Sequence, residues 1–238
     1  MTKKALVLIP CCKRKNASSK DGDFVTPIAG LEDRREELKK LVMSTHELAS
    51  KPENILGILG DKGNAVMACH LYTGWFYGVT GHLLEEIATT NRFPQISILI
   101  VSAFYGLVRL NEGIKIYELE MSSRLYGRGT VYSFWRKAEL WRYLNLYVDE
   151  NDIEYIWSLL PSSMPRFPYH QVFSEFWKGA PRMGLKCFHV RIPGAGSNTG
   201  YMRATWLRKV LEEEPDFLLG KNLSNPGQSW IEDCVFPP

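Results

Sequence analysis

Short, almost wholly apolar runs recur along the chain. Two of them, Ala5–Pro10 and residues 96–101, are typical of strands buried on both faces of a parallel sheet, and the second is rich in β-branched side chains. Residues 153–160 and 187–192 predict two later strands, the second from its alternating pattern. Residues 55–59 predict one more short strand. Four longer strands spread along the chain favour a central sheet.

Amphipathic patterns between these runs predict helices at residues 31–50, 131–146 and 202–213, and the charged run 33–37 is expected on the solvent face of the first. Strands that alternate with helices indicate an α/β domain with a mainly parallel sheet and helices on both faces. We expect one domain over residues 1–238, with residues 215–238 lying on the surface as a C-terminal tail.

Composition indicates what class of protein this is but says little about its function. The chain has 238 residues and a net charge of +3, which permits nucleic-acid binding without arguing for it. Its five cysteines form no C-x-x-C pair, which argues against a zinc ribbon or a disulfide framework. We therefore expect no metal and no cofactor. The first apolar run is too short for a signal sequence or a membrane span, so we expect a cytoplasmic protein without membrane contacts.

A tight turn follows the apolar run 96–101, where Ser102 begins the sequence SAFYGL. Open α/β sheets place ligands at the carboxyl ends of their strands, so this turn is a candidate site. Tyr117, Glu118 and Glu120 follow soon after it. In a strand the two glutamates would share one face, and in a helix they would diverge. The plainer interpretation is a loop beside a solvated acidic patch.

Basic side chains occupy two other loops. Lys13, Arg14 and Lys15 follow the first predicted strand, and Arg124 and Arg128 lie in the loop at residues 122–129. Lysine and arginine in such loops could bind phosphates, and solvated basic turns remain the alternative. The neighbouring Cys11 and Cys12 are expected to pack rather than to act as nucleophiles, because no base lies near them in sequence.

Aromatic residues interleave with glycines at residues 72–78. A nucleobase stacked on Trp75 or Tyr77 would suit this segment, since stacking on an aromatic side chain is worth about 1–3 kcal/mol per base. A buried helix packed through its glycines is the alternative that the same residues leave open.

Several of these segments resemble the YaaA group of peroxide-stress proteins. SAFYGL at residues 102–107, IYELEM at 116–121 and VYSFW at 131–135 are similar, in order and spacing, to that group's S-x-x-Y-G-L, Y-x-L-E-M and L-Y-x-F-W segments. GWFYG at residues 74–78 looks like its earlier G-x-x-Y-x-G segment. The resemblance is spread over residues 5–180 and implies a DNA-binding α/β protein.

A second resemblance concerns the loops. LIPCCK at residues 8–13 is similar to relatives of this group with a fold like that of uracil-DNA glycosylase, among them base-exchanging tRNA-modification domains and DNA glycosylases that attack modified phage bases. The loop after residue 160 resembles the minor-groove loop of uracil-DNA glycosylases. This likeness implies that Ser162, Ser163 and Arg166 contact DNA and that His170 touches a leaving group or a phosphate, although a lone histidine is also compatible with a structural role.

The leading hypothesis is a DNA glycosylase that hydrolyses the N-glycosidic bond of a damaged or modified base, such as a hypermodified phage base, in duplex or single-stranded DNA. Glu120, or else Glu118, would stabilise positive charge on the sugar. Tyr105 would stack on the base, and Lys13 and Ser102 would hold a phosphate or a water. The remaining expected substrate contacts are Tyr77, Trp75, Tyr117 and His170.

Two alternatives stay open. One is a non-catalytic DNA-binding stress-response protein, and the other is a base-exchanging transglycosylase that acts on RNA. Because no lysine lies in an evident Schiff-base setting, the sequence favours a monofunctional hydrolytic enzyme over a lyase.

Overall fold

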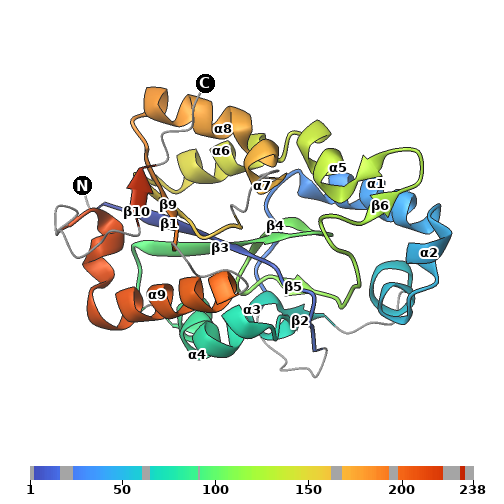
Figure 1. Cartoon of the computed structure of the whole chain (residues 1–238), viewed down its shortest axis with the longest axis horizontal. Helices are drawn as coiled ribbons and strands as arrows, with labels where there is room; N and C mark the ends of the chain where they lie inside the picture. The colour runs from blue at the N-terminus through green and yellow to red at the C-terminus, as the bar shows by residue number, and fades with distance from the viewer. Residues whose placement is uncertain are drawn as a thin grey trace.

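The structure is a computed structural model that describes residues 3–16, 24–60, 65–90, 92–161, 168–192, 198–221 and 231–233. Its centre is a six-stranded sheet in the order β10-β9-β8-β1-β3-β4 (Figure 1). The strands are β1 (Ala5–Pro10), β3 (Ile96–Ser102), β4 (Gly106–Arg109), β8 (Tyr155–Ser158), β9 (Lys186–Val190) and β10 (Ile231–Asp233). Two small sheets pair β2 (Val66–Met67) with β5 (Gly113–Ile114), and β6 (Arg124–Leu125) with β7 (Gly129–Thr130).

The helices follow the order α1 (Leu31–Met43), α2 (His46–Ala49), the π-helix η1 (Asn54–Leu59), α3 (Ala68–Leu71), α4 (Trp75–Thr89), α5 (Val131–Lys137) and α6 (Leu140–Glu150). The later ones are α7 (Pro168–Val172), α8 (Ser174–Gly179), the 3-10 helix η2 (Ala180–Met183), α9 (Thr199–Glu213) and the 3-10 helix η4 (Pro215–Leu219). In Figure 1, α3, α4 and α9 cover one face of the sheet, and α5, α6 and α8 cover the other.

The parallel core of the sheet is built on β1. It pairs in parallel with β3 on one side and with β8 on the other, and β9 continues the parallel order beyond β8. The first strand is buried from Ala5 to Ile9 because helices cover both faces, which is why its sequence is apolar rather than alternating. Strands β4 and β10 are antiparallel edges. The predicted α/β class with a mostly parallel sheet is confirmed.

Three predicted elements differ in the structure. The helix expected at residues 31–50 is split into α1 and α2, and the one expected at 131–146 is split into α5 and α6 at Glu139, whose φ of 54° is left-handed. The strand expected at residues 55–59 is wrong, because this segment is the π-helix η1. A Cβ on Gly57 would lie 1.6 Å from the carbonyl oxygen of Ile116, so the glycine lets η1 lie directly against the segment that carries the two glutamates.

The expectation that residues 215–238 lie on the surface is wrong at the start of that segment. Phe217, Leu218 and Leu219 in η4 are buried, and Trp157 Nε1 donates a hydrogen bond to the Leu218 carbonyl oxygen at 2.9 Å. Apolar side chains one after another in a short 3-10 turn give no helical period, which is why the sequence pattern missed them. Of the rest, residues 222–230 and 234–238 lie outside the described residues.

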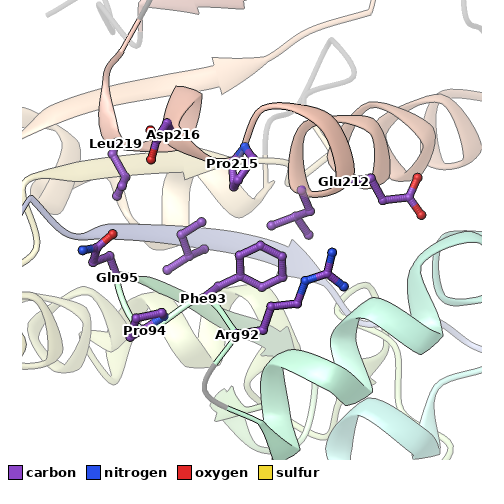
Figure 2. A pocket seen from close by; sticks show the side chains of 10 residues that line it. Arg92, Phe93, Pro94, Gln95, Glu212, Pro215, Asp216 and Leu219 are labelled. Atoms are coloured by element: carbon purple, nitrogen blue, oxygen red, sulfur yellow. The ribbon is translucent and has the colours of Figure 1, made fainter.

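A hollow of about 300 Å³ lies at the amino end of β3, beside Ile96. Figure 2 shows Phe93 and Arg92 on one side of it and Pro215 and Asp216 on the other. It is therefore at the opposite end of β3 from Ser102, the last residue of that strand. The hollow and the turn predicted as a site are separate features of the molecule.

Candidate active site at the carboxyl edge of the sheet

Three buried hydroxyl groups meet at the carboxyl end of β3. Tyr117 Oη lies 2.8 Å from Ser102 Oγ and 2.9 Å from Tyr72 Oη, and Tyr72 Oη donates to Ser102 Oγ at 3.2 Å. Each hydroxyl therefore has two partners inside the protein, as buried polar groups require. This hydroxyl cluster, Tyr72, Ser102 and Tyr117, ties the end of β3 to the segments before α4 and after β5.

The turn after β3 holds the cluster in place. The backbone N–H of Tyr105 donates to Ser102 Oγ at 3.1 Å. Gly106 has a φ of 72°, and a Cβ there would approach Trp135 and Leu140 to 3.0 Å, so both conformation and space require glycine. Trp135 Nε1 also donates to the Ala103 carbonyl oxygen at 2.8 Å. The serine and the glycine of the S-x-x-Y-G-L pattern are therefore both needed to form this turn.

An exposed ion pair joins the loop after β1 to the segment that carries Tyr117. Lys13 Nζ, in the loop after β1, lies 3.1 Å from Glu120 Oε1, with side chains 71% and 49% exposed. The Glu120 backbone N–H donates to Ser123 Oγ at 3.0 Å, which fixes the chain around the carboxylate. The pair brings together the first predicted catalytic residue and a predicted phosphate ligand.

Glu118 has a different environment. Its Oε1 accepts a hydrogen bond from Lys51 Nζ at 2.9 Å, and this bond lowers the pKa of the Glu118 carboxyl below its usual range. Asn54 in η1 binds the backbone of Glu118 on both sides, accepting from its N–H at 2.8 Å and donating to its carbonyl at 3.2 Å. Residues 115–120 are not a strand, yet Tyr117 and Leu119 are buried while the two glutamates are more exposed.

Lys15 lies over the hydroxyl cluster from the other side. Its Nζ is 4.1 Å from the centre of the Tyr117 ring and 5.8 Å from that of Tyr72, and it donates to the Lys13 carbonyl oxygen at 3.3 Å. Burial lowers the pKa of the Lys15 ammonium, and Cys11, Cys12 and the carboxylates of Glu118 and Glu120 oppose this effect. The three neighbouring basic residues therefore differ: Lys13 and Arg14 are exposed, and Lys15 is partly buried.

The two cysteines beside these lysines are poor nucleophiles. Burial raises the pKa of both thiols above the ordinary value. Cys12 Sγ donates to the Arg14 carbonyl oxygen at 2.9 Å and accepts from the Gly74 N–H at 3.3 Å. A thiol kept protonated by burial reacts slowly, so the structure agrees with a packing role for Cys11 and Cys12.

The predicted stacking residues have diverse environments. Tyr77 is buried and its hydroxyl donates to the Pro10 carbonyl oxygen at 2.9 Å, while Tyr105 Oη accepts from the Lys115 N–H at 3.0 Å. Both hydroxyls are thus hydrogen-bonded within the protein, which favours a packing role for these two tyrosines over stacking on a base. Trp75 begins α4 and is 75% exposed, so its ring is accessible to a ligand.

The other residues predicted to contact DNA lie outside the turn after β3 and the segment with the two glutamates. Arg124 in β6 and Arg128 between β6 and β7 are exposed, and Arg128 lines a shallow hollow of about 80 Å³ together with Arg34 and Lys137. His170 lies in α7, but its side chain is not among those described. Ser162, Ser163 and Arg166 fall outside the described residues. Roles in binding for these residues stay predictions.

Sequence reasoning missed three contributors. Lys51 and Asn54 lie between the helix predicted at residues 31–50 and the strand predicted at 55–59, and the packing of η1 brings them to Glu118. Tyr72 belongs to the aromatic segment at residues 72–78, but the residues next to it in sequence did not predict its hydrogen bonds to Ser102 and Tyr117.

Within the described parts of the chain, no three His, Cys, Asp or Glu side chains are arranged to hold a metal ion. No described helix is both long and apolar enough to cross a membrane.

The site lies within the part of the chain that matches a known family. The model of the family described as peroxide stress protein YaaA matches residues 7–170, which include most of β1, the turn after β3 and the segment with both glutamates. A search of curated proteins finds no match. Because the family model covers more than half of the 238 residues, this chain belongs to the YaaA family of peroxide stress proteins.

Proposed function

We propose that the protein binds DNA and releases a damaged or modified base by cleaving its N-glycosidic bond. The observation that carries the proposal is the Lys13–Glu120 ion pair, 3.1 Å long, at the carboxyl edge of a parallel sheet. A carboxylate in that position can stabilise the positive charge that develops on a sugar as its base departs. The lysine beside it neutralises the carboxylate until a phosphate competes for the lysine.

The arrangement of charge supports a nucleic-acid substrate. Lys13 pairs with Glu120, the neighbouring Arg14 is exposed, and Arg124 and Arg128 are exposed on the β6–β7 hairpin. Phosphate contacts from such residues would hold the backbone while one nucleotide leaves the base stack, which costs a few kcal/mol. Trp75 offers an exposed ring on which an extruded base could stack.

Glu118 is less suited to this role than Glu120. It is bound to Lys51 at 2.9 Å and its backbone is bound on both sides by Asn54, so its contacts fix the chain. We assign Glu118 a positioning role and Glu120 the electrostatic one.

A second candidate is a DNA-binding protein without catalysis. One observation favours it: the rings of Tyr72, Tyr77 and Tyr117 are at most 4% exposed and their hydroxyls are bound within the protein, so these rings leave no open face for a base.

The experiment that separates the two is a screen for base release. The protein is incubated with DNA oligonucleotides that each carry one modified base, and abasic sites are revealed by cleavage in alkali. Alkali-labile sites with at least one modified base support the proposal. Binding to the same oligonucleotides with no abasic site on any of them would leave only the binding function.

A further inference from the structure

Tyr126 presents an exposed aromatic ring on the hairpin formed by β6 and β7. It lies between the two strands and is 76% exposed. Within the parts of the chain that the structure describes, no other aromatic ring and no cationic group lies against it. A single exposed aromatic side chain is common on proteins, so its surroundings decide what it can bind.

The hairpin holds this ring in a defined position. Leu125 is buried, and the Tyr126 backbone N–H donates to Thr45 Oγ1 at 2.9 Å, which ties the hairpin to the start of α2. Gly127 and Gly129 have φ angles of 65° and 84°, a left-handed conformation that favours glycine, so the turn depends on both of them. A side chain presented by an ordered turn loses less conformational freedom on binding than one on a flexible loop.

Two arginines flank the ring in the sequence. Arg124 and Arg128 are exposed, and among the described residues no carboxylate lies within 4.0 Å of either guanidinium group. Arg128 also lines the shallow hollow of about 80 Å³ with Arg34 and Lys137, where Glu37 is already paired with Arg34 at 3.1 Å. Guanidinium groups without a carboxylate partner suit phosphates, which they bind through two parallel hydrogen bonds. The surface therefore fits a partner that combines flat aromatic groups with phosphates.

We propose that the β6–β7 hairpin binds unpaired nucleotides of single-stranded DNA, with Tyr126 stacked on one base and Arg124 and Arg128 bound to phosphates of the same strand. The inference rests on the proposed function and deepens it, because it selects single-stranded DNA as the substrate. Inside a duplex both faces of a base are covered by its neighbours, so such a base has no face to offer the ring. An unpaired base has one, and stacking on an aromatic side chain tolerates any base sequence.

The hairpin is joined directly to the candidate active site. Ser123, the residue before β6, donates its backbone N–H to the Glu120 carbonyl oxygen at 2.9 Å, and its Oγ accepts from the Glu120 N–H at 3.0 Å. The Val131 N–H, at the other end of the hairpin, donates to the Ser123 carbonyl oxygen at 3.1 Å. Tyr126 is six positions after Glu120, so their Cα atoms are at most about 22 Å apart. A few nucleotides of one strand span that distance.

The test compares single-stranded and duplex DNA as probes. Fluorescence anisotropy measures the binding of a labelled oligothymidine, and of a fully paired duplex of the same length, to the unchanged protein, Tyr126→Ala and Tyr126→Trp. We expect Tyr126→Ala to bind oligothymidine about 5- to 150-fold more weakly, the factor that one stacked base contributes, and to bind the duplex as before. Tyr126→Trp keeps an aromatic ring and should retain the affinity. The matched control is Tyr201→Ala, at an exposed tyrosine on α9, which should bind both probes as the unchanged protein does.

Ultraviolet crosslinking of the unchanged protein to single strands that contain iododeoxyuridine, mapped by peptide mass spectrometry, makes the test independent of how the variants fold. A crosslink at Tyr126 is expected, and crosslinks only at other residues overturn the inference. Undiminished binding of oligothymidine by Tyr126→Ala, or an equal loss on both probes, overturns it while DNA binding stands.

The outcomes also separate this inference from the proposed function. If the unchanged protein binds neither probe, the inference fails together with the DNA-binding part of that function. A selective loss in Tyr126→Ala, with no base released from any modified oligonucleotide in the alkaline assay, would retain the role of the hairpin and refute the glycosylase proposal. Base release with undiminished binding by Tyr126→Ala would do the reverse.

Discussion

Arg35 and Glu112 form a buried ion pair beneath the turn that leads from β3 to β4. Arg35 Nη1 lies 2.7 Å from Glu112 Oε1, with side chains 10% and 1% exposed. Arg35 also donates to the carbonyl oxygens of Tyr105 and Leu107, at 2.9 and 3.1 Å. This arginine belongs to the charged run 33–37, which was expected on the solvent face, and that expectation is wrong for Arg35 alone. One arginine of α1 thus holds the turn of the candidate site.

We expect Glu112→Gln to destabilise the fold strongly. Removing one partner of a buried ion pair leaves the other charge uncompensated, at a cost of about 3–5 kcal/mol. Denaturant unfolding measures the loss. The matched control is Glu37→Gln, which removes the exposed partner of Arg34 on the same helix and should cost less than about 1 kcal/mol. Equal, small losses in the two variants would show that the buried pair does not stabilise the turn.

The hydroxyl cluster predicts a second stability effect. Tyr117→Phe removes one hydroxyl and leaves Ser102 Oγ and Tyr72 Oη each short of a partner, although the two still bond to one another. Leaving a buried polar group short of a hydrogen bond costs about 1–3 kcal/mol. Thermal melting should show a clear drop for this variant and none for Tyr126→Phe, where the ring is exposed. If both variants melt like the unchanged protein, the cluster does not contribute to stability.

Glu120→Gln tests the catalytic assignment. The change keeps the shape of the side chain and removes its charge, and losing a preorganised electrostatic partner costs about 10²–10³ in rate. Single-turnover base release should fall by that factor while DNA binding persists. Because Glu120 pairs with the exposed Lys13, the melting temperature should barely move. Full activity in this variant would remove Glu120 from the mechanism.

Charge reversal on the hairpin tests the phosphate surface. Arg124→Glu and Arg128→Glu should weaken DNA binding irrespective of base sequence, because binding to phosphates carries no sequence information. On duplex DNA, the dependence of log affinity on log salt should become less steep by about 0.9 for each phosphate that the variant no longer binds. Lys178→Glu on α8, where the lysine pairs with Glu175, is the control. Unchanged affinity and slope would place the DNA elsewhere.

The Lys51–Glu118 pair predicts a pH dependence. Since the pKa of Glu118 is lowered in the folded protein, its contribution to stability is fully present above the ordinary carboxyl pKa and is lost as the pH falls through the lowered one. The stability difference between the unchanged protein and Glu118→Gln should be constant between about pH 7 and pH 5 and should narrow below about pH 4. A difference that does not change over this range would mean that the carboxylate contributes no charge-dependent stability.

By itself the sequence determined the strands and turns that depend on residues close together in the chain. The apolar runs that became β1, β3 and β8 are buried on both faces, so consecutive apolar residues predict them, whereas β9 alternates buried and more exposed residues and is predicted by that alternation. The turn at residues 102–107 could be predicted for the same reason, because Ser102 bonds to the N–H of Tyr105 and Gly106 adopts the φ that its neighbours require.

Only the tertiary structure decided which distant residues meet. Arg35 lies in a charged run that looks solvated, yet it is buried because Glu112, 77 positions later, lies beneath the turn. Lys15 looks like Lys13 in sequence, yet Lys15 is partly buried against the rings of Tyr72 and Tyr117, whereas Lys13 is exposed. The charge state of a side chain depends on its exposure to solvent and on the groups around it. Both are set by contacts between segments that are far apart in the chain, and the sequence pattern does not predict which segments meet.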